Sequence, residues 1–97
     1  MNTLRIFLAD DHAVVREGLK AMINGQAGLE VVGEAANGIE AVTRVAELNP
    51  DVVVVDVSMP GLSGAQVATR LKQSDPTRKI LALTPGVPAL DGFPPHC

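Results

Sequence analysis

The chain has 97 residues, of which 46% are hydrophobic and 20% charged, which is the composition of a single ordinary globular domain and excludes a wholly disordered chain. Its net charge of -3 provides no basic surface for a phosphate backbone, so we expect no direct binding of nucleic acid by this chain. The apolar runs are too short to cross a membrane, and the single cysteine, Cys97, fits a reducing compartment, so we expect a cytoplasmic protein without a membrane partner.

The N-terminal part of the chain predicts a strand followed by a helix. Residues 4–9, with Ile6, Phe7 and Leu8 adjacent, predict a buried strand that ends at two consecutive acids, Asp10 and Asp11. Residues 13–24 predict a helix that ends at Gly25. The apolar face of this helix is expected to consist of Val15, Leu19, Met22 and Ile23.

The next part of the chain repeats this pattern. Residues 29–33 predict a second short strand, and residues 39–48 predict a second helix, which Asn49 and Pro50 close. The apolar face of the second helix is expected to consist of Ile39, Val42, Val45 and Ala46.

The stretch from residue 51 to residue 64 carries the strongest single signal. Residues 51–57 contain four consecutive valines without alternation, which is typical of a parallel strand buried on both faces. Asp56 lies at the C-terminal end of this strand, where open α/β sheets place their ligand sites. Because an acid is costly at the end of a buried run unless something binds it, we favour a functional role for Asp56.

The chain then predicts one more helix and one more strand. A Pro-Gly turn ends the valine strand, and Ser63 is a suitable N-cap for a helix over residues 64–74. Residues 79–84 predict a fourth strand that ends at Thr84.

This alternation of strands and helices predicts an α/β fold with a parallel sheet and right-handed crossovers. In the flavodoxin-like strand order 2-1-3-4, the first and third strands are neighbours at the topological switch point. We therefore expect Asp10 and Asp11 to face Asp56 across a crevice, with Thr84 at the end of the next strand.

Three carboxylates that converge in this way repel one another unless a cation lies between them. Mg2+ prefers carboxylate and phosphate oxygens, whereas Zn2+ prefers His or Cys and only His12 is near, so Mg2+ is the expected cofactor. An aspartate at a strand end beside Mg2+ can act as a nucleophile toward phosphorus and form an aspartyl phosphate. Thr84 is then placed to hydrogen-bond a phosphate oxygen.

The same motifs, in this order, resemble those of a known family. Asp10-Asp11 after the first strand, the segment from Asp56 to Gly61 after the third, and Leu83-Thr84 after the fourth resemble the receiver domain of two-component response regulators. Further segments resemble the subfamily whose receivers precede a helix-turn-helix output domain in transcription regulators: Gly33-Glu34-Ala35, Asn37-Gly38, Glu40-Ala41 and Arg78-Lys79-Ile80-Leu81.

The resemblance implies a role for each site residue. Asp56 would be the phosphoacceptor, a histidine kinase or a small phosphodonor would supply the phosphoryl group, and Thr84 would be the switch hydroxyl. Asp11 and Asp56 would bind Mg2+ together with the backbone carbonyl of Ser58, while Asp10 would contribute through water. The protein would not be a turnover enzyme, and at most it would catalyse its own phosphorylation and dephosphorylation.

The family pattern continues after the threonine with a fourth helix, a fifth strand that ends in a lysine, and a fifth helix. We therefore expect a partial receiver domain over residues 1–84, an incomplete sheet that lacks the fifth strand and the last two helices, and a Pro- and Gly-rich tail over residues 85–97. The fourth strand would then be an exposed edge, and we expect a homodimer or larger assembly through it.

Other interpretations stay open. The absent lysine favours a receiver-like dimerising scaffold that is impaired in phosphorylation. A phosphatase of the haloacid dehalogenase type also uses a strand-end Asp and Mg2+, but it needs a second Asp where this chain has Ser58. Asp10 and Asp11 can also be simple helix N-caps, and His12 is expected to face solvent rather than to bind metal.

Overall fold

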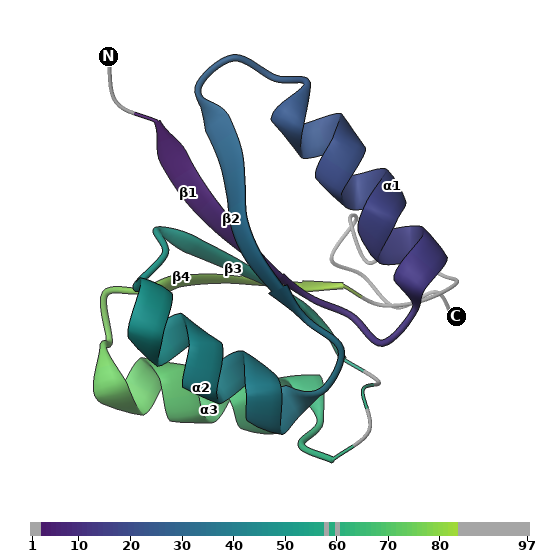
Figure 1. Ribbon diagram of the computed structural model, residues 1–97. Helices are drawn as coiled ribbons and strands as arrows, with labels where there is room; N and C mark the ends of the chain where they lie inside the picture. The colour runs from purple at the N-terminus through teal and green to yellow at the C-terminus, as the bar shows by residue number, and fades with distance from the viewer. Residues whose placement is uncertain (1–2, 58, 60, 84–97) are drawn as a thin grey trace, which may run out of the picture.

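The computed structural model describes residues 3–57, 59 and 61–83, which form a parallel sheet with helices on both faces (Figure 1). The strands are β1 (Leu4–Ala9), β2 (Leu29–Ala35), β3 (Val52–Asp56) and β4 (Lys79–Leu83). The helices are α1 (Ala13–Asn24), α2 (Gly38–Leu48) and α3 (Gly64–Ser74). The strand order β2-β1-β3-β4 confirms the predicted flavodoxin-like α/β fold. The predicted lack of a fifth strand and two helices concerns residues outside the described ones.

The predicted bounds of β1, α1 and α3 agree with the observed ones, and the other elements differ by one or two residues. The second strand was expected to end at residue 33, but β2 continues to Ala35 because Glu34 and Ala35 pair with the last two residues of β1. β3 is one residue shorter at each end than expected, and α2 begins one residue earlier, at Gly38. Thr84, the expected last residue of the fourth strand, lies outside the described residues.

The face of the sheet that α2 and α3 cover contains the larger hydrophobic core. Phe7 of β1 is fully buried and pairs in register with Val53 of β3, which is also fully buried. Helices α2 and α3 contribute Ala41, Val45, Val67 and Leu71 to this cluster. The valine run is therefore a central strand, as its sequence predicted.

The buried face of α2 differs from the predicted one. Ile39 is 64% exposed, whereas the small residues Gly38 and Ala41 are buried together with Val45. A Cβ atom at Gly38 would lie 2.5 Å from the Cβ atom of Leu62, so a larger residue there would have to displace its neighbours. The close approach of α2 to the segment before α3 thus depends on small side chains, and the apolar periodicity alone does not reveal it.

The opposite face, which α1 covers, is less completely buried. Leu19 and Ile23 of α1 pack against a smaller cluster formed by Ile6, Leu8 and Val54. The other two residues of the predicted apolar face, Val15 and Met22, are 46% and 61% exposed. Only half of the predicted face therefore contacts the sheet.

The edge strand β4 pairs with β3 and, among the described residues, with no second strand. Leu81 points to the α1 side of the sheet and is 59% exposed. Within the part of the chain that the structure describes, no helix is long and apolar enough to cross a membrane.

Candidate functional site

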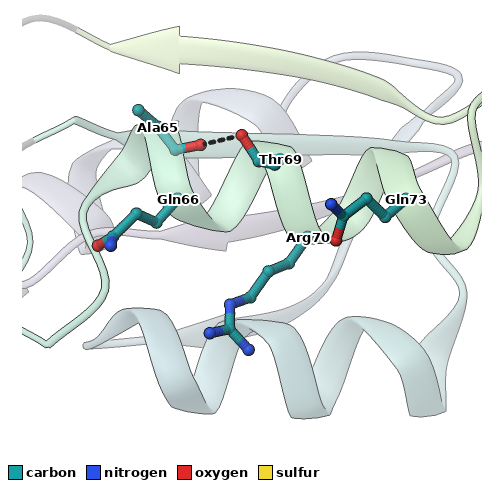
Figure 2. A pocket seen from close by; sticks show the side chains of 5 residues that line it. All are labelled: Ala65, Gln66, Thr69, Arg70 and Gln73. Carbon is teal, nitrogen blue, oxygen red and sulfur yellow. Dashed lines mark hydrogen bonds between the residues drawn. The ribbon is translucent and has the colours of Figure 1, made fainter.

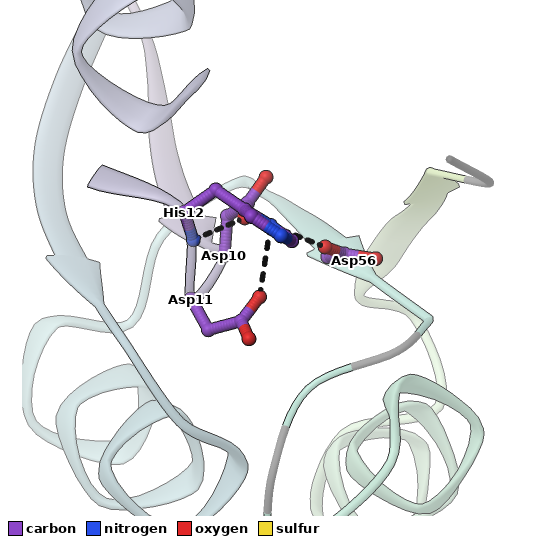
Figure 3. A group of neighbouring side chains, drawn as sticks. All are labelled: Asp10, Asp11, His12 and Asp56. Carbon is purple, nitrogen blue, oxygen red and sulfur yellow. Dashed lines mark hydrogen bonds and ion pairs between the residues drawn. The ribbon is translucent and has the colours of Figure 1, made fainter. Parts of the chain in front are cut away.

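The predicted acidic residues lie at the C-terminal ends of two neighbouring strands. Asp10 and Asp11 follow β1 directly, and Asp56 is the last residue of β3. Because Ala9 of β1 pairs with Val55 of β3, the residues that follow them are brought side by side at one end of the sheet (Figure 3). Asp10 and Asp56 are both only 3% exposed, whereas Asp11 reaches the surface. The structure therefore brings the three carboxylates together.

His12 faces solvent, as expected, with 58% of its side chain exposed, and its ring also lies beside this cluster. Its Nδ1 atom lies 3.0 Å from Oδ1 of Asp10, 3.0 Å from Oδ1 of Asp11 and 3.6 Å from Oδ2 of Asp56 (Figure 3). The hydrogen bond to Asp10 and the charge of Asp11 raise the pKa of the His12 imidazole above its ordinary value. When it is protonated, the ring is a local counter-charge for the carboxylates.

The alternative that Asp10 and Asp11 merely cap α1 is wrong for this structure. The N-cap residue of α1 is His12, and α1 has no hydrogen bond from a capping side chain. Oδ1 of Asp10 instead accepts a hydrogen bond of 2.8 Å from the backbone N–H of His12, which tightens the turn that leads into the helix. This turn directs both acids toward β3.

The start of α3 lies directly against the end of β3. Ser63 and Gln66 form a capping box that fixes the first turn of α3, so Ser63 is the N-cap that its sequence position predicted. A Cβ atom at Gly64 would lie 2.5 Å from Cα of Val57 and 2.6 Å from the carbonyl oxygen of Asp56. Only glycine allows this approach, so Gly64 helps to define the wall of the site beside Asp56.

Two of the predicted site residues lie outside the described residues. Ser58, expected to offer its backbone carbonyl, and Thr84, expected to offer its hydroxyl, are not among them. The residue before Thr84, Leu83, pairs in register with Asp56, so β4 ends next to the acidic cluster. The roles of Ser58 and Thr84 stay predictions.

The donor atoms of the cluster suit a hard divalent cation. One ligand atom from each of Asp10, Asp11, His12 and Asp56 can be chosen so that all four lie within 4.8 Å of one another. Carboxylate oxygens are the ligands that Mg2+ prefers, and several of its positions remain for water and phosphate oxygens. The acidic cluster therefore fits the magnesium ion that the sequence predicted.

A separate hollow of about 550 Å³ lies along α3 (Figure 2). It is lined by Ala65, Gln66, Thr69, Arg70 and Gln73. Thr69 uses its hydroxyl to donate a hydrogen bond to the carbonyl oxygen of Ala65, and Arg70 points toward α2 (Figure 2). Among the described residues no carboxylate lines this hollow, so its lining differs from that of the acidic site.

Comparison with known proteins agrees with the motifs. The family model of the response regulator receiver domain matches residues 6–88. The chain is 48% identical over 82 residues to the oxygen regulatory protein NreC of Staphylococcus epidermidis, in a match that covers 84% of this chain and 38% of that protein. The chain thus spans well under half the length of this curated relative.

Solved structures show the same fold. A LuxR-family two-component response regulator from Aurantimonas sp. SI85-9A1 is similar with a TM-score of 0.84 and 37% identity, over 94% of this chain and 65% of that chain. The isolated REC domain of RcsB from Salmonella enterica serovar Typhimurium, solved in the presence of the phosphomimetic BeF3-, is similar with a TM-score of 0.80 and 27% identity, over 88% of this chain and 64% of that chain.

Proposed function

The chain belongs to the response regulator receiver domain family of two-component systems, and from this premise we propose that it takes up a phosphoryl group on Asp56 with Mg2+ bound in the acidic cluster. The observation that carries the proposal is the place of Asp56, which is buried at the end of β3 and grouped with Asp10, Asp11 and His12. A histidine kinase or a small phosphodonor would supply the phosphoryl group. Family membership also supports a cytoplasmic location.

In the proposed reaction, a carboxylate oxygen of Asp56 attacks the phosphorus atom. The new P–O bond forms as the bond between phosphorus and the donor breaks, and the electron pair of that bond leaves with the donor. Bound Mg2+ would offset the negative charge of the phosphoryl oxygens. The protein would act as a phosphoacceptor that is modified and reset, rather than as an enzyme that turns over an external substrate.

Each residue of the site would have its own role in the reaction. Asp11 and Asp56 would hold the metal together with the backbone carbonyl of Ser58, and Asp10 would act through water. Asp10 is almost fully buried and hydrogen-bonded to the turn, which suits a residue that orients others. The hydroxyl of Thr84 would donate a hydrogen bond to an oxygen of the phosphoryl group. These assignments rest on the match between the family motifs and the positions of this chain.

The test is incubation of the chain with Mg2+ and acetyl phosphate, followed by intact-protein mass spectrometry. We expect the mass to increase by one phosphoryl group, and we expect no increase in Asp56→Asn. Asp51→Asn is the matched control, because Asp51 lies just before the other end of β3 and its Oδ2 accepts a hydrogen bond from the backbone N–H of Arg5. Absence of an Asp56-dependent increase in the wild type would contradict the proposal.

A second candidate function is a dimerising scaffold, which the exposed edge strand favours. β4 has one edge without a partner strand among the described residues, and its Leu81 is largely exposed. Such edges pair with other chains. We expect light scattering to show dimers or larger species that a charged edge residue, as in Leu81→Lys, disperses. A compact monomer of the wild type at high concentration would exclude this function.

A further inference from the structure

Arg16 connects α1 to the turn that carries the acidic residues. Its side chain is 17% exposed and runs back along α1 toward the end of β1. Nη1 of Arg16 donates a hydrogen bond of 2.6 Å to the backbone carbonyl oxygen of Asp10. Nε of the same guanidinium donates a hydrogen bond of 2.7 Å to Oε1 of Glu34 on β2. A single side chain thus joins the turn after β1 to the neighbouring strand.

Glu34 is itself firmly anchored. Its second oxygen, Oε2, accepts a hydrogen bond of 2.7 Å from Nζ of Lys20, one turn further along α1. Hydrogen bonds from Lys20 and Arg16 hold the pKa of the Glu34 carboxyl below its ordinary value. Glu34 therefore stays ionised at neutral pH and holds the guanidinium of Arg16 in one orientation.

The backbone contacts of Asp10 show how the orientation of the Arg16 guanidinium affects the acidic cluster. The backbone N–H of Asp10 donates to the carbonyl oxygen of Ala35 at 3.0 Å, which continues the pairing of β1 with β2. Its carbonyl oxygen is held by Arg16. Because the peptide bond is planar, fixing the carbonyl oxygen of Asp10 also fixes the N–H of Asp11 and the direction in which Asp11 leaves the strand.

We propose that Arg16 is a positioning residue for the acidic cluster: it fixes the peptide between Asp10 and Asp11 and thereby places the Asp11 carboxylate beside Asp56. This inference rests on the proposed function, in which Asp11 is a metal ligand. Arg16 would thus orient a metal ligand without binding the metal itself. Loss of residues that orient metal ligands in this way weakens metal binding by about 10- to 100-fold.

The geometry requires arginine and not simply a positive charge. The guanidinium offers several N–H groups in a rigid plane, so it can reach the Asp10 carbonyl and Glu34 at the same time. A lysine ammonium is a single point charge on a flexible stem. Lys20 cannot replace Arg16, because its ammonium is already engaged by Glu17 and Glu34.

The experiment measures the affinity of the full chain for Mn2+, a probe for the magnesium site, from the decrease of the free-ion signal in electron paramagnetic resonance. The variants are Arg16→Lys, which keeps the charge, and Glu34→Ala, which releases the guanidinium. The control is Lys20→Ala, which contacts Glu34 but not Asp10. Urea unfolding of each variant shows whether it remains folded, and the amide resonance of Asp11 in the metal-free protein reports the orientation of its peptide.

We expect Arg16→Lys to bind Mn2+ about 10- to 100-fold more weakly while it remains folded, and its Asp11 amide resonance to move. Glu34→Ala should follow in the same direction by less, and Lys20→Ala, which leaves the contacts of Arg16 with Glu34 and Asp10 in place, should change Mn2+ binding least of the three. If Arg16→Lys binds Mn2+ as the wild type does, or if Lys20→Ala weakens binding equally, Arg16 only ties α1 to β2 and the inference is wrong.

The proposed function is checked separately by Asp11→Asn and Asp56→Asn in the same assay. If these variants bind Mn2+ as tightly as the wild type, the ion does not bind in the acidic cluster, and both the proposed metal site and the role of Arg16 are refuted. If they lose binding while Arg16→Lys retains it, the metal site stands and only the role of Arg16 is refuted.

Discussion

The two ends of the sheet differ in how their charged side chains are arranged. At the C-terminal ends of β1 and β3, three carboxylates are gathered around one imidazole ring. At the opposite end, the guanidinium of Arg5 donates hydrogen bonds of 2.9 Å to the carbonyl oxygens of Leu48 and Asn49, which end α2. Carboxylates are thus collected at the end that carries the proposed function, whereas at the opposite end a guanidinium joins β1 to the end of α2 through backbone carbonyls.

Arg78 also connects separate segments of the chain at this opposite end of the sheet. Its side chain is 7% exposed, and Nη2 donates a hydrogen bond of 2.9 Å to Oδ1 of Asn49. Nη1 lies 3.5 Å from the hydroxyl of Ser74 at the end of α3. Arg78 borders a hollow of about 370 Å³ that Asp51 and Asp75 also line. The comparison therefore predicts that changes at this end alter stability and that changes at the other end alter metal binding.

The largest effect on stability is expected for Arg78→Ala. The substitution removes a side chain that is only 7% exposed, together with its packing and its hydrogen bond to Asn49, which should lower the free energy of unfolding by about 3 kcal/mol. Urea denaturation monitored by circular dichroism measures the loss. Affinity for Mn2+, measured in the folded state, should not change, and a coupled loss of affinity would break the distinction between the two ends.

A smaller loss is expected for Arg5→Ala. Two charge-assisted hydrogen bonds to the last carbonyls of α2 disappear, and because these carbonyls can regain water, we expect a loss of about 1.5–2 kcal/mol. The matched control is Arg44→Ala, since Nη1 of Arg44 is 3.9 Å from Glu40 in an exposed pair on the same helix. That variant should change stability by less than about 0.5 kcal/mol. Equal losses in the two variants would show that the carbonyl contacts of Arg5 add nothing.

At the end of the sheet that carries the acidic cluster, we expect bound Mg2+ to change the stability of the protein. Mg2+ at ten times its dissociation constant should raise the free energy of unfolding of the wild type by about 1.4 kcal/mol, since it binds only the folded chain. Asp11→Asn should lose this gain and Asp51→Asn should keep it. Thermal unfolding with and without Mg2+ measures both. A gain that survives in Asp11→Asn would place the ion elsewhere.

The smallest effect concerns the dependence of stability on pH. The pKa of Glu34 is lowered from its ordinary value of 4.5, so its contribution is fully present above that pH and is lost as the pH falls through the lower folded-state value. Because the side chain is 31% exposed, we expect less than about 1 kcal/mol. Asp75 titrates in the same direction, so the measurement is the difference between wild type and Glu34→Gln. If both proteins lose the same stability as the pH falls, the pairing of Glu34 with Arg16 and Lys20 is contradicted.

The sequence predicted the frame of the site because its signals are local. The valine run and the acid that follows it identified β3 and Asp56, and the βα rhythm placed the acids after β1 at the same end of the sheet. The N-cap Ser63 was also readable, since a capping box depends on residues only three positions apart.

The residues that complete the site could not be predicted in the same way. His12 faces solvent as expected, but nothing in its neighbourhood along the chain indicates that its ring nitrogen lies beside the carboxylates. The contact between Arg16 and Glu34 joins residues 18 positions apart and depends on the register of β1 with β2. No periodicity in the sequence encodes that contact: Arg16 lies in a correctly predicted helix, but Glu34 lies beyond the predicted end of the second strand.

The sequence by itself therefore determined the order of the elements, the buried central strand and the acids at the C-terminal ends of the strands. Backbone propensity and apolar periodicity act over a few residues, so these features can be predicted locally. Only the tertiary structure decided which side chains meet at the ends of the strands: the ring of His12 among the carboxylates, and Arg16 between Glu34 and the Asp10 carbonyl. The physical reason is that strand register and side-chain rotamers follow from packing between distant segments, which the order of residues along the chain does not state.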